Sequence, residues 1–176
     1  MNYWYRLMRF FFYSAVKNHP SAKYKHHLLS FASAKSVGIV YDGTSAEDVS
    51  SVEKFVESLR QKNIQVETLI YLPKEKNAIP KPNTFSGKEV GITYKPAGEI
   101  VEQFCSKKLD VLFALFHHEN LPLEFVTLTS QATCRVGLYH PEKTNCFELM
   151  IKPSDKNSIE ENLNQSIALL NQVKND

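Results

Sequence analysis

The sequence contains few cysteines, few glycines and no long apolar run. Three cysteines, Cys105, Cys134 and Cys146, cannot all pair within one chain, which excludes a disulfide scaffold and favours buried, reduced thiols. A membrane-spanning helix needs about 20 consecutive, mostly apolar residues, and the sequence offers no such run. Only 6 glycines occur in 176 residues, so collagen-like and glycine-rich disordered chains are excluded as well.

The chain has the length and composition of one globular domain. Its 176 residues are 43% hydrophobic and 23% charged, which suits a single core of ordinary size. Because no export signal is evident and the thiols are expected to be reduced, the sequence predicts a cytoplasmic protein.

Charge is distributed unevenly along the chain. The net charge is only +2, yet residues 1–35 hold 6 of the 21 basic residues and none of the 19 acidic ones. Such asymmetry indicates a segment that meets an anionic partner, such as lipid or nucleic acid. The basic residues concerned are Arg6, Arg9, Lys17, Lys23, Lys25 and Lys35.

The first 17 residues predict an aromatic, amphipathic helix that ends before His19-Pro20, because proline cannot continue it. One face collects residues at spacings of three and four, namely Trp4, Leu7, Met8, Phe11 and Ala15. We expect the domain itself, a second subunit or another protein to cover this face. Peripheral contact with the inner face of a membrane is the alternative. Interleaved aromatic and basic residues are also compatible with base stacking, but no nucleic acid is expected as a partner. The candidate contact residues are Trp4, Arg6, Leu7, Met8, Arg9 and Phe11.

A second N-terminal helix is expected over residues 23–34. It would bury Leu28, Leu29 and Phe31 and leave His26 and His27 in solvent. Neighbouring helical residues point about 100° apart, so these two histidines are poorly placed to bind one metal. The sequence thus predicts a basic, aromatic helical segment over 1–35 and an α/β domain over 36–176.

From residue 36 onward, short apolar runs alternate with helical patterns. This alternation predicts an α/β sandwich with a mostly parallel sheet of five to six strands, Rossmann- or flavodoxin-like. The run 111–116 should be the central strand and 147–151 a half-exposed edge strand, while 73–86 should leave the sheet as a proline-rich excursion. Strands are expected at 37–41, 66–72, 90–93, 111–116, 134–139 and 147–151.

Ligands of open α/β sheets bind beyond the carboxyl ends of the strands, where the strand order reverses. If the first strand lies beside 111–116, polar side chains from two loops meet there, and a third loop follows the next strand. The candidate crevice consists of Asp42, Gly43, Thr44, Ser45, His117, His118, Glu119, Asn120 and His140.

Specific chemistry at this crevice is not indicated. Asp42-Gly43-Thr44 resembles part of the phosphatase motif Asp-x-Asp-Gly-Thr, but Val40 replaces the nucleophilic aspartate. One glycine in the turn is too few for a dinucleotide fingerprint, and no His-x-x-x-His or Cys-x-x-Cys spacing favours a metal. The sequence therefore predicts no catalytic residue, no metal and no cofactor. Weak phosphate binding at the helix start near Ser45 remains an alternative.

Several strand segments together resemble a bacterial domain family of unknown function. They are Lys35–Asp42, Leu109–Leu112, Arg135–Tyr139 and Phe147–Ile151, followed by the C-terminal helix. The resemblance covers about residues 30–173 and implies a small Rossmann- or flavodoxin-like domain without catalytic residues to transfer. Arg135-Val136-Gly137 is also locally similar to the sugar-nucleotide half of heptosyltransferases, but the chain is too short for both domains of such enzymes.

These observations favour a non-catalytic binding or adaptor module. The competing hypothesis is an enzyme or binding protein for a nucleotide or another phosphorylated ligand, using the crevice at Asp42–Ser45 and His117–Asn120. Convergence of Asp42, Ser45, His117 and Glu119 into an open pocket would favour the second hypothesis.

Overall fold

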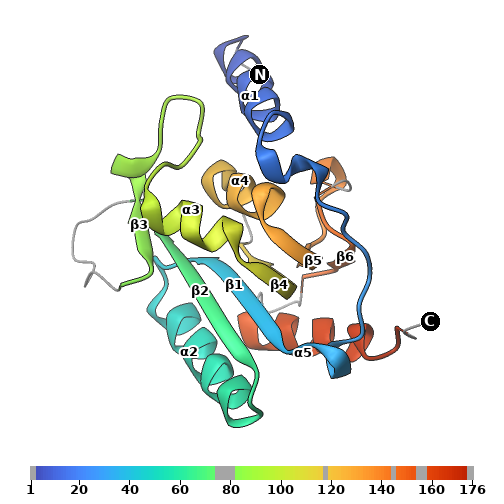
Figure 1. The fold of residues 1–176 in the computed structure, drawn as a ribbon. Coiled ribbons are helices and arrows are strands. Elements are labelled where there is room, and N and C mark those ends of the chain that lie inside the picture. Colours follow the sequence, from blue (N-terminus) through green and yellow to red (C-terminus); the bar gives the residue numbers. More distant parts are fainter. Residues whose placement is uncertain (1–2, 74–81, 117–118, 144–145, 154–157, 174–176) are drawn as a thin grey trace.

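The computed structural model describes residues 3–73, 82–116, 119–143, 146–153 and 158–173 (Figure 1). Within them the α-helices are α1 (Tyr3–Lys17), α2 (Ala46–Gln61), α3 (Glu99–Ser106), α4 (Leu121–Thr129) and α5 (Ile159–Leu170). The strands are β1 (Ser36–Asp42), β2 (Gln65–Leu72), β3 (Thr84–Ser86), β4 (Lys108–Leu115), β5 (Gln131–Leu138) and β6 (Leu149–Ile151).

The six strands form one sheet in the order β3-β2-β1-β4-β5-β6, and every neighbouring pair is parallel. The expected α/β fold is thereby confirmed. This is the strand order of Rossmann folds, not the 2-1-3-4-5 order of flavodoxins. The order reverses between β1 and β4, which lie side by side at the centre of the sheet.

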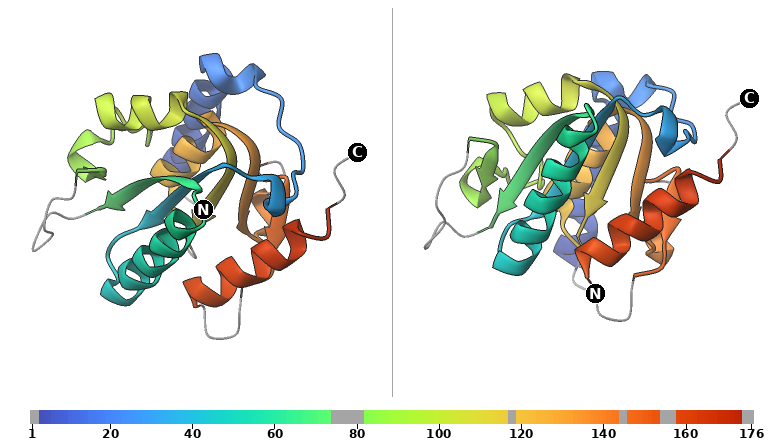
Figure 2. Two further views of the ribbon diagram at one scale, coloured as in Figure 1. Left: turned by 60° about the horizontal axis from the view of Figure 1, so that its bottom comes forward. Right: turned by 90° about the horizontal axis from the view of Figure 1, so that it is seen from below.

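Helices cover both faces of the sheet, so its central strands are buried on both sides (Figure 2). Helices α2 and α5 pack on one face, where Ile39 and Phe113 belong to the core. Helices α3 and α4 pack on the other, against Val40 and Leu112. The apolar run 111–116 is completely buried, as a strand with helices above and below requires.

The edge of the sheet beyond β2 differs from the prediction. The third strand is β3 at 84–86, inside the segment expected to leave the sheet, and 90–93 forms no strand. The single apolar residue of β3, Phe85, is buried against Tyr71 with 4.9 Å between ring centroids. Val90 makes only an isolated antiparallel bridge with Pro96. One buried aromatic side chain thus fixes a strand that a hydrophobic pattern could not reveal.

The expected helix over 23–34 is also wrong. Apart from the 3₁₀ turns Pro20–Lys23 and Phe31–Ser33, this segment is not helical, and Tyr24, Ser30 and Ala34 have extended backbone angles. The His27 amide donates to the Thr133 carbonyl at 2.8 Å, and His26 Nδ1 lies 2.7 Å from the Ala132 carbonyl oxygen. Hydrogen bonds to β5 therefore replace helical ones. His26 is half-buried rather than solvated, and this burial lowers the pKa of its imidazole.

Candidate functional site

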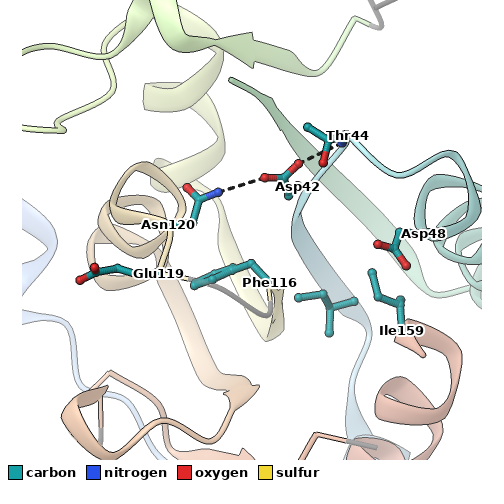
Figure 3. A pocket seen from close by; sticks show the side chains of 8 residues that line it. Asp42, Thr44, Asp48, Phe116, Glu119, Asn120 and Ile159 are labelled. Carbon is teal, nitrogen blue, oxygen red and sulfur yellow. Dashed lines mark hydrogen bonds between the residues drawn. The ribbon is translucent and has the colours of Figure 1, made fainter. Parts of the chain in front are cut away.

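At the reversal point, Asp42 and Asn120 join the ends of two central elements. Asp42 ends β1, and Asn120 precedes α4, which follows β4. The Asn120 side-chain amide donates a hydrogen bond to Asp42 Oδ2 at 3.3 Å (Figure 3). The sheet therefore brings these two sequence-predicted residues together, although 78 positions separate them.

The polar groups around this pair mostly hold the turns themselves. The Thr44 amide donates to Asp42 Oδ1 at 2.9 Å. Ser45 caps α2 by accepting from the Asp48 amide at 3.2 Å, and Asn120 caps α4 by accepting from the Leu123 amide at 3.3 Å. The Thr44 and Asp48 amides, two donors that could face a phosphate at the β1–α2 turn, are thus engaged within the protein.

Two small hollows flank the Asp42–Asn120 pair, of about 280 and 340 Å³. Asp42, Glu119 and Asn120 line both of them. The first is completed by Thr44, Asp48, Leu115, Phe116 and Ile159 (Figure 3). The second is completed by Tyr71, Pro73, Tyr94, Leu121 and Pro122. Their sizes reach only the lower end of the range for small-molecule sites.

The charge of these hollows disfavours a phosphorylated ligand. Asp42, Asp48 and Glu119 contribute carboxylates, and none of the described lining residues is lysine or arginine. Such walls repel a phosphate instead of steering it inward.

Gly43 also has a packing role, because a Cβ there would lie 2.5 Å from Ile70 Cγ2.

The remaining crevice candidates are three histidines. His117 and His118 lie outside the described residues. His140 is exposed and lines neither hollow. Among the described residues, no three His, Cys, Asp or Glu side chains are grouped to hold a metal.

The cysteines lack the character of nucleophiles. All three thiols are free and buried. Burial is the main cause that raises the pKa of Cys105, Cys134 and Cys146 to about 11 in each case. At neutral pH these side chains are protonated, whereas nucleophilic attack needs the thiolate.

Helix α1 packs on α4 mainly through Phe12, which lies outside the face that the sequence predicted; from that face, Ala15 takes part in the contact. Phe12 is fully buried against Leu121 and Phe125, and the Phe12 and Phe125 ring centroids are 6.0 Å apart. By contrast, Trp4 is 64% exposed and Phe11 45% exposed. The expected contact face therefore points mostly away from the domain. The packing face is centred on Phe12, one residue after the predicted Phe11. The sequence could not distinguish the two faces, because α1 is apolar around most of its circumference.

A polar network, buried at Glu124 and Lys143 and more exposed at Tyr13 and Arg9, accompanies this packing and was not foreseen. Tyr13 donates its hydroxyl to Glu124 Oε1 at 3.0 Å, and the Lys143 ammonium contacts Glu124 Oε2 at 3.0 Å. Arg9 donates to the Tyr13 oxygen at 3.1 Å and lies 3.6 Å from Glu119. Glu124 was the available signal, since it is the one charged residue in the apolar helix α4.

The three most exposed aromatic side chains of the described residues lie on the outer face of α1. Tyr3, Trp4 and Phe10 are 77%, 64% and 67% exposed, and Phe11 lies beside Phe10 with 5.7 Å between ring centroids. Figure 1 shows that the N-terminal part of α1 projects beyond the body of the domain. None of the helices in the described ranges is long and apolar enough to cross a bilayer.

Comparison with known families assigns the chain to a family. Residues 8–173 match the family of unknown function DUF6913. The chain belongs to DUF6913. The match includes most of α1 and the whole α/β body, in agreement with the resemblance to a domain family of unknown function. It lends no support to the local similarity with heptosyltransferases. No curated protein and no solved structure matches the chain.

Proposed function

We propose that this DUF6913 member is a non-catalytic binding module whose working surface is the outer face of α1. The observation that carries the proposal is the arrangement of α1 itself. Phe12 fastens the helix to α4, while Tyr3, Trp4, Phe10 and Phe11 remain exposed. Exposed apolar surface of this kind marks interaction sites on soluble domains.

The crevice supports the non-catalytic part of the proposal. Asp42 and Asn120 satisfy the turns at the ends of β1 and β4, so their polar atoms already have partners. Catalytic acids, bases and nucleophiles usually show perturbed proton affinities in a cleft. The thiols shifted here are buried in the core and their shift makes them less reactive.

The polar network supports the binding part of the proposal. Tyr13 joins α1 to Glu124 of α4, and Lys143 holds the Glu124 carboxylate in turn. A helix held in this way presents its outer face without the entropic cost of ordering it on contact. The α/β body then serves as the scaffold that positions α1.

A ligand screen tests the non-catalytic part. Thermal unfolding of the full chain is measured with nucleotides, sugar nucleotides, inorganic phosphate and divalent metals, because a ligand that prefers the folded state raises the melting temperature. We expect no shift beyond that of a salt control. A shift that disappears in Asp42→Asn would contradict the proposal.

Photocrosslinking in cells tests the binding part. Benzoylphenylalanine is placed at Phe10 or, as the matched control, at Tyr139, an exposed aromatic residue outside α1 (53% exposed). We expect adducts at position 10, with protein or with lipid as identified by mass spectrometry, and none at position 139. Equal adduct yields at both positions, or none at either, would contradict a working surface on α1.

A further inference from the structure

We infer that the partner of the outer face of α1 is the surface of an anionic lipid bilayer. This inference rests on the proposed function, which it makes specific. It follows from the shape of the face, from the kind of side chains on it, and from the charge around it.

The face is continuous and lies opposite the packing side. Tyr3, Leu7 and Phe10 follow spacings of four and three, and Trp4, Leu7 and Phe11 do the same, so they form one stripe. Leu7 is half-buried, and the four aromatic residues are exposed. Phe12, on the other side, fills the contact with α4. The stripe is therefore available from Tyr3 to Phe11 without undocking the helix.

The side chains suit the boundary between headgroups and acyl chains. Tyrosine and tryptophan are enriched there because one end of each ring system is apolar and the other polar. Phe10 and Phe11 add purely apolar rings that gain by leaving water. A helix of 15 residues is about 22 Å long, which suffices to lie in the plane of the interface but not to cross the bilayer.

The positive charge around the stripe favours an anionic bilayer over a second copy of the chain or a nucleic acid. Helix α1 carries exposed Arg6 and Lys17 beside the stripe and no acidic residue, and all of residues 1–35 are free of acid. Two copies of this face would bring these cations together. Single-stranded nucleic acid is usually held in a basic groove, whereas here four exposed aromatic rings outnumber two exposed cations on a convex helix.

The only tryptophan of the chain, Trp4, makes the test direct. The full-length protein is mixed with vesicles of phosphatidylcholine containing phosphatidylglycerol, and with pure phosphatidylcholine vesicles as the control. We expect a blue shift of the fluorescence and quenching by brominated lipid with the anionic vesicles. Both effects should weaken as salt rises, because screening reduces the attraction of Arg6 and Lys17.

Matched variants assign the binding to the stripe. Phe10→Ser/Phe11→Ser should weaken vesicle partitioning by roughly tenfold or more, since two apolar rings no longer leave water. Tyr139→Ser changes an aromatic residue outside α1 whose exposure, 53%, lies between those of Phe10 and Phe11, and it should leave the partitioning unchanged. Arg6→Gln and Lys17→Gln should each cost about fivefold, the effect of one juxtamembrane cation. Circular dichroism checks that α1 remains helical in every variant.

Other outcomes would overturn the inference. They are an unchanged Trp4 spectrum with anionic vesicles, equal binding to neutral vesicles, or a larger mass in solution that Phe10→Ser/Phe11→Ser abolishes. Trp4 quenching by single-stranded RNA without any lipid response would overturn it too. Adducts of position 10 with a protein, in the absence of vesicle binding, would overturn the lipid assignment and leave the proposed working surface intact.

Discussion

Tyr13 donates its hydroxyl to Glu124 across 3.0 Å, although the two residues lie 111 positions apart. The contact joins the first helix of the chain to a helix that covers the sheet. Burial is the main reason that the pKa of Tyr13 rises to about 12, so the phenol remains a donor at any physiological pH. The N-terminal helix is therefore built into the domain through a buried carboxylate.

Lys143 is the charge partner that makes this carboxylate tolerable. Glu124 and Lys143 are 1% and 5% exposed, so removing one leaves an uncompensated buried charge. Lys143→Met should lower the free energy of unfolding by about 3–5 kcal/mol, measured by urea denaturation. Glu124→Leu/Lys143→Met should be less destabilising than the single variant. A double variant that loses the sum of both single effects would show that the two charges are not coupled.

Phe12 and Phe11 form a matched pair of adjacent, chemically identical side chains. Phe12→Ala should cost about 3 kcal/mol, because it leaves a cavity between α1 and α4. Phe11→Ala should change stability by less than about 0.5 kcal/mol, since Phe11 faces outward. Thermal unfolding measures both, and the anisotropy of Trp4 fluorescence reports whether α1 has come loose. Equal effects of the two substitutions would contradict the packing described for α1.

Sequence patterns predicted the centre of the fold and failed at its edges. Residues 37–41 and 111–116 are unbroken apolar runs, and only a strand covered on both faces needs such a run. Strand β3 has one deeply buried ring, Phe85. Segment 23–34 is not one continuous helix, because His26 and His27 form hydrogen bonds with β5. Both depend on tertiary partners that local periodicity does not contain.

Of the two candidate surfaces, the crevice could be predicted from the sequence and the packing face of α1 could not. Asp42 and Asn120 could be placed together, because topology alone brings the ends of β1 and β4 to one edge. The packing face of α1 could not be chosen, since Phe10, Phe11 and Phe12 are consecutive and point in three directions. Which ring is buried depends on Phe125 and Glu124, more than a hundred residues away.

Asn120 should matter for stability more than for chemistry. Asn120→Ala removes the cap of α4 and the bond to Asp42, which should cost about 1–2 kcal/mol. Asn120→Asp keeps the cap but opposes two carboxylates. Its stability deficit, measured by urea denaturation at several pH values, should be largest at neutral pH and shrink in acid, where protonation removes the repulsion. A deficit independent of pH would argue against direct contact between the two side chains.

Phe113 tests the centre of the sheet. It is fully buried, with the rings of Phe31 and Phe55 each 6.0 Å from its own. Phe113→Ala should therefore cost about 3–5 kcal/mol through lost burial and a cavity, seen as a lower midpoint in a circular-dichroism melt. Phe113→Leu, which retains most of the volume, should cost clearly less. An unchanged midpoint for the alanine variant would show that β4 is not part of the core.

The buried thiols give the protein a predictable weakness in alkali. Burial raises the pKa of Cys105, Cys134 and Cys146 to about 11 in the folded state, from an ordinary value of 9.0. Between these values the unfolded chain loses protons that the folded chain keeps, so stability is intact below about pH 9 and falls as pH rises toward 11. Each thiol contributes a slope of at most about 1.4 kcal/mol per pH unit. Urea denaturation under reducing conditions should show a shallower decline for a folded variant with all three cysteines changed to serine. An identical decline would mean that other groups, such as the buried tyrosines, carry the whole effect.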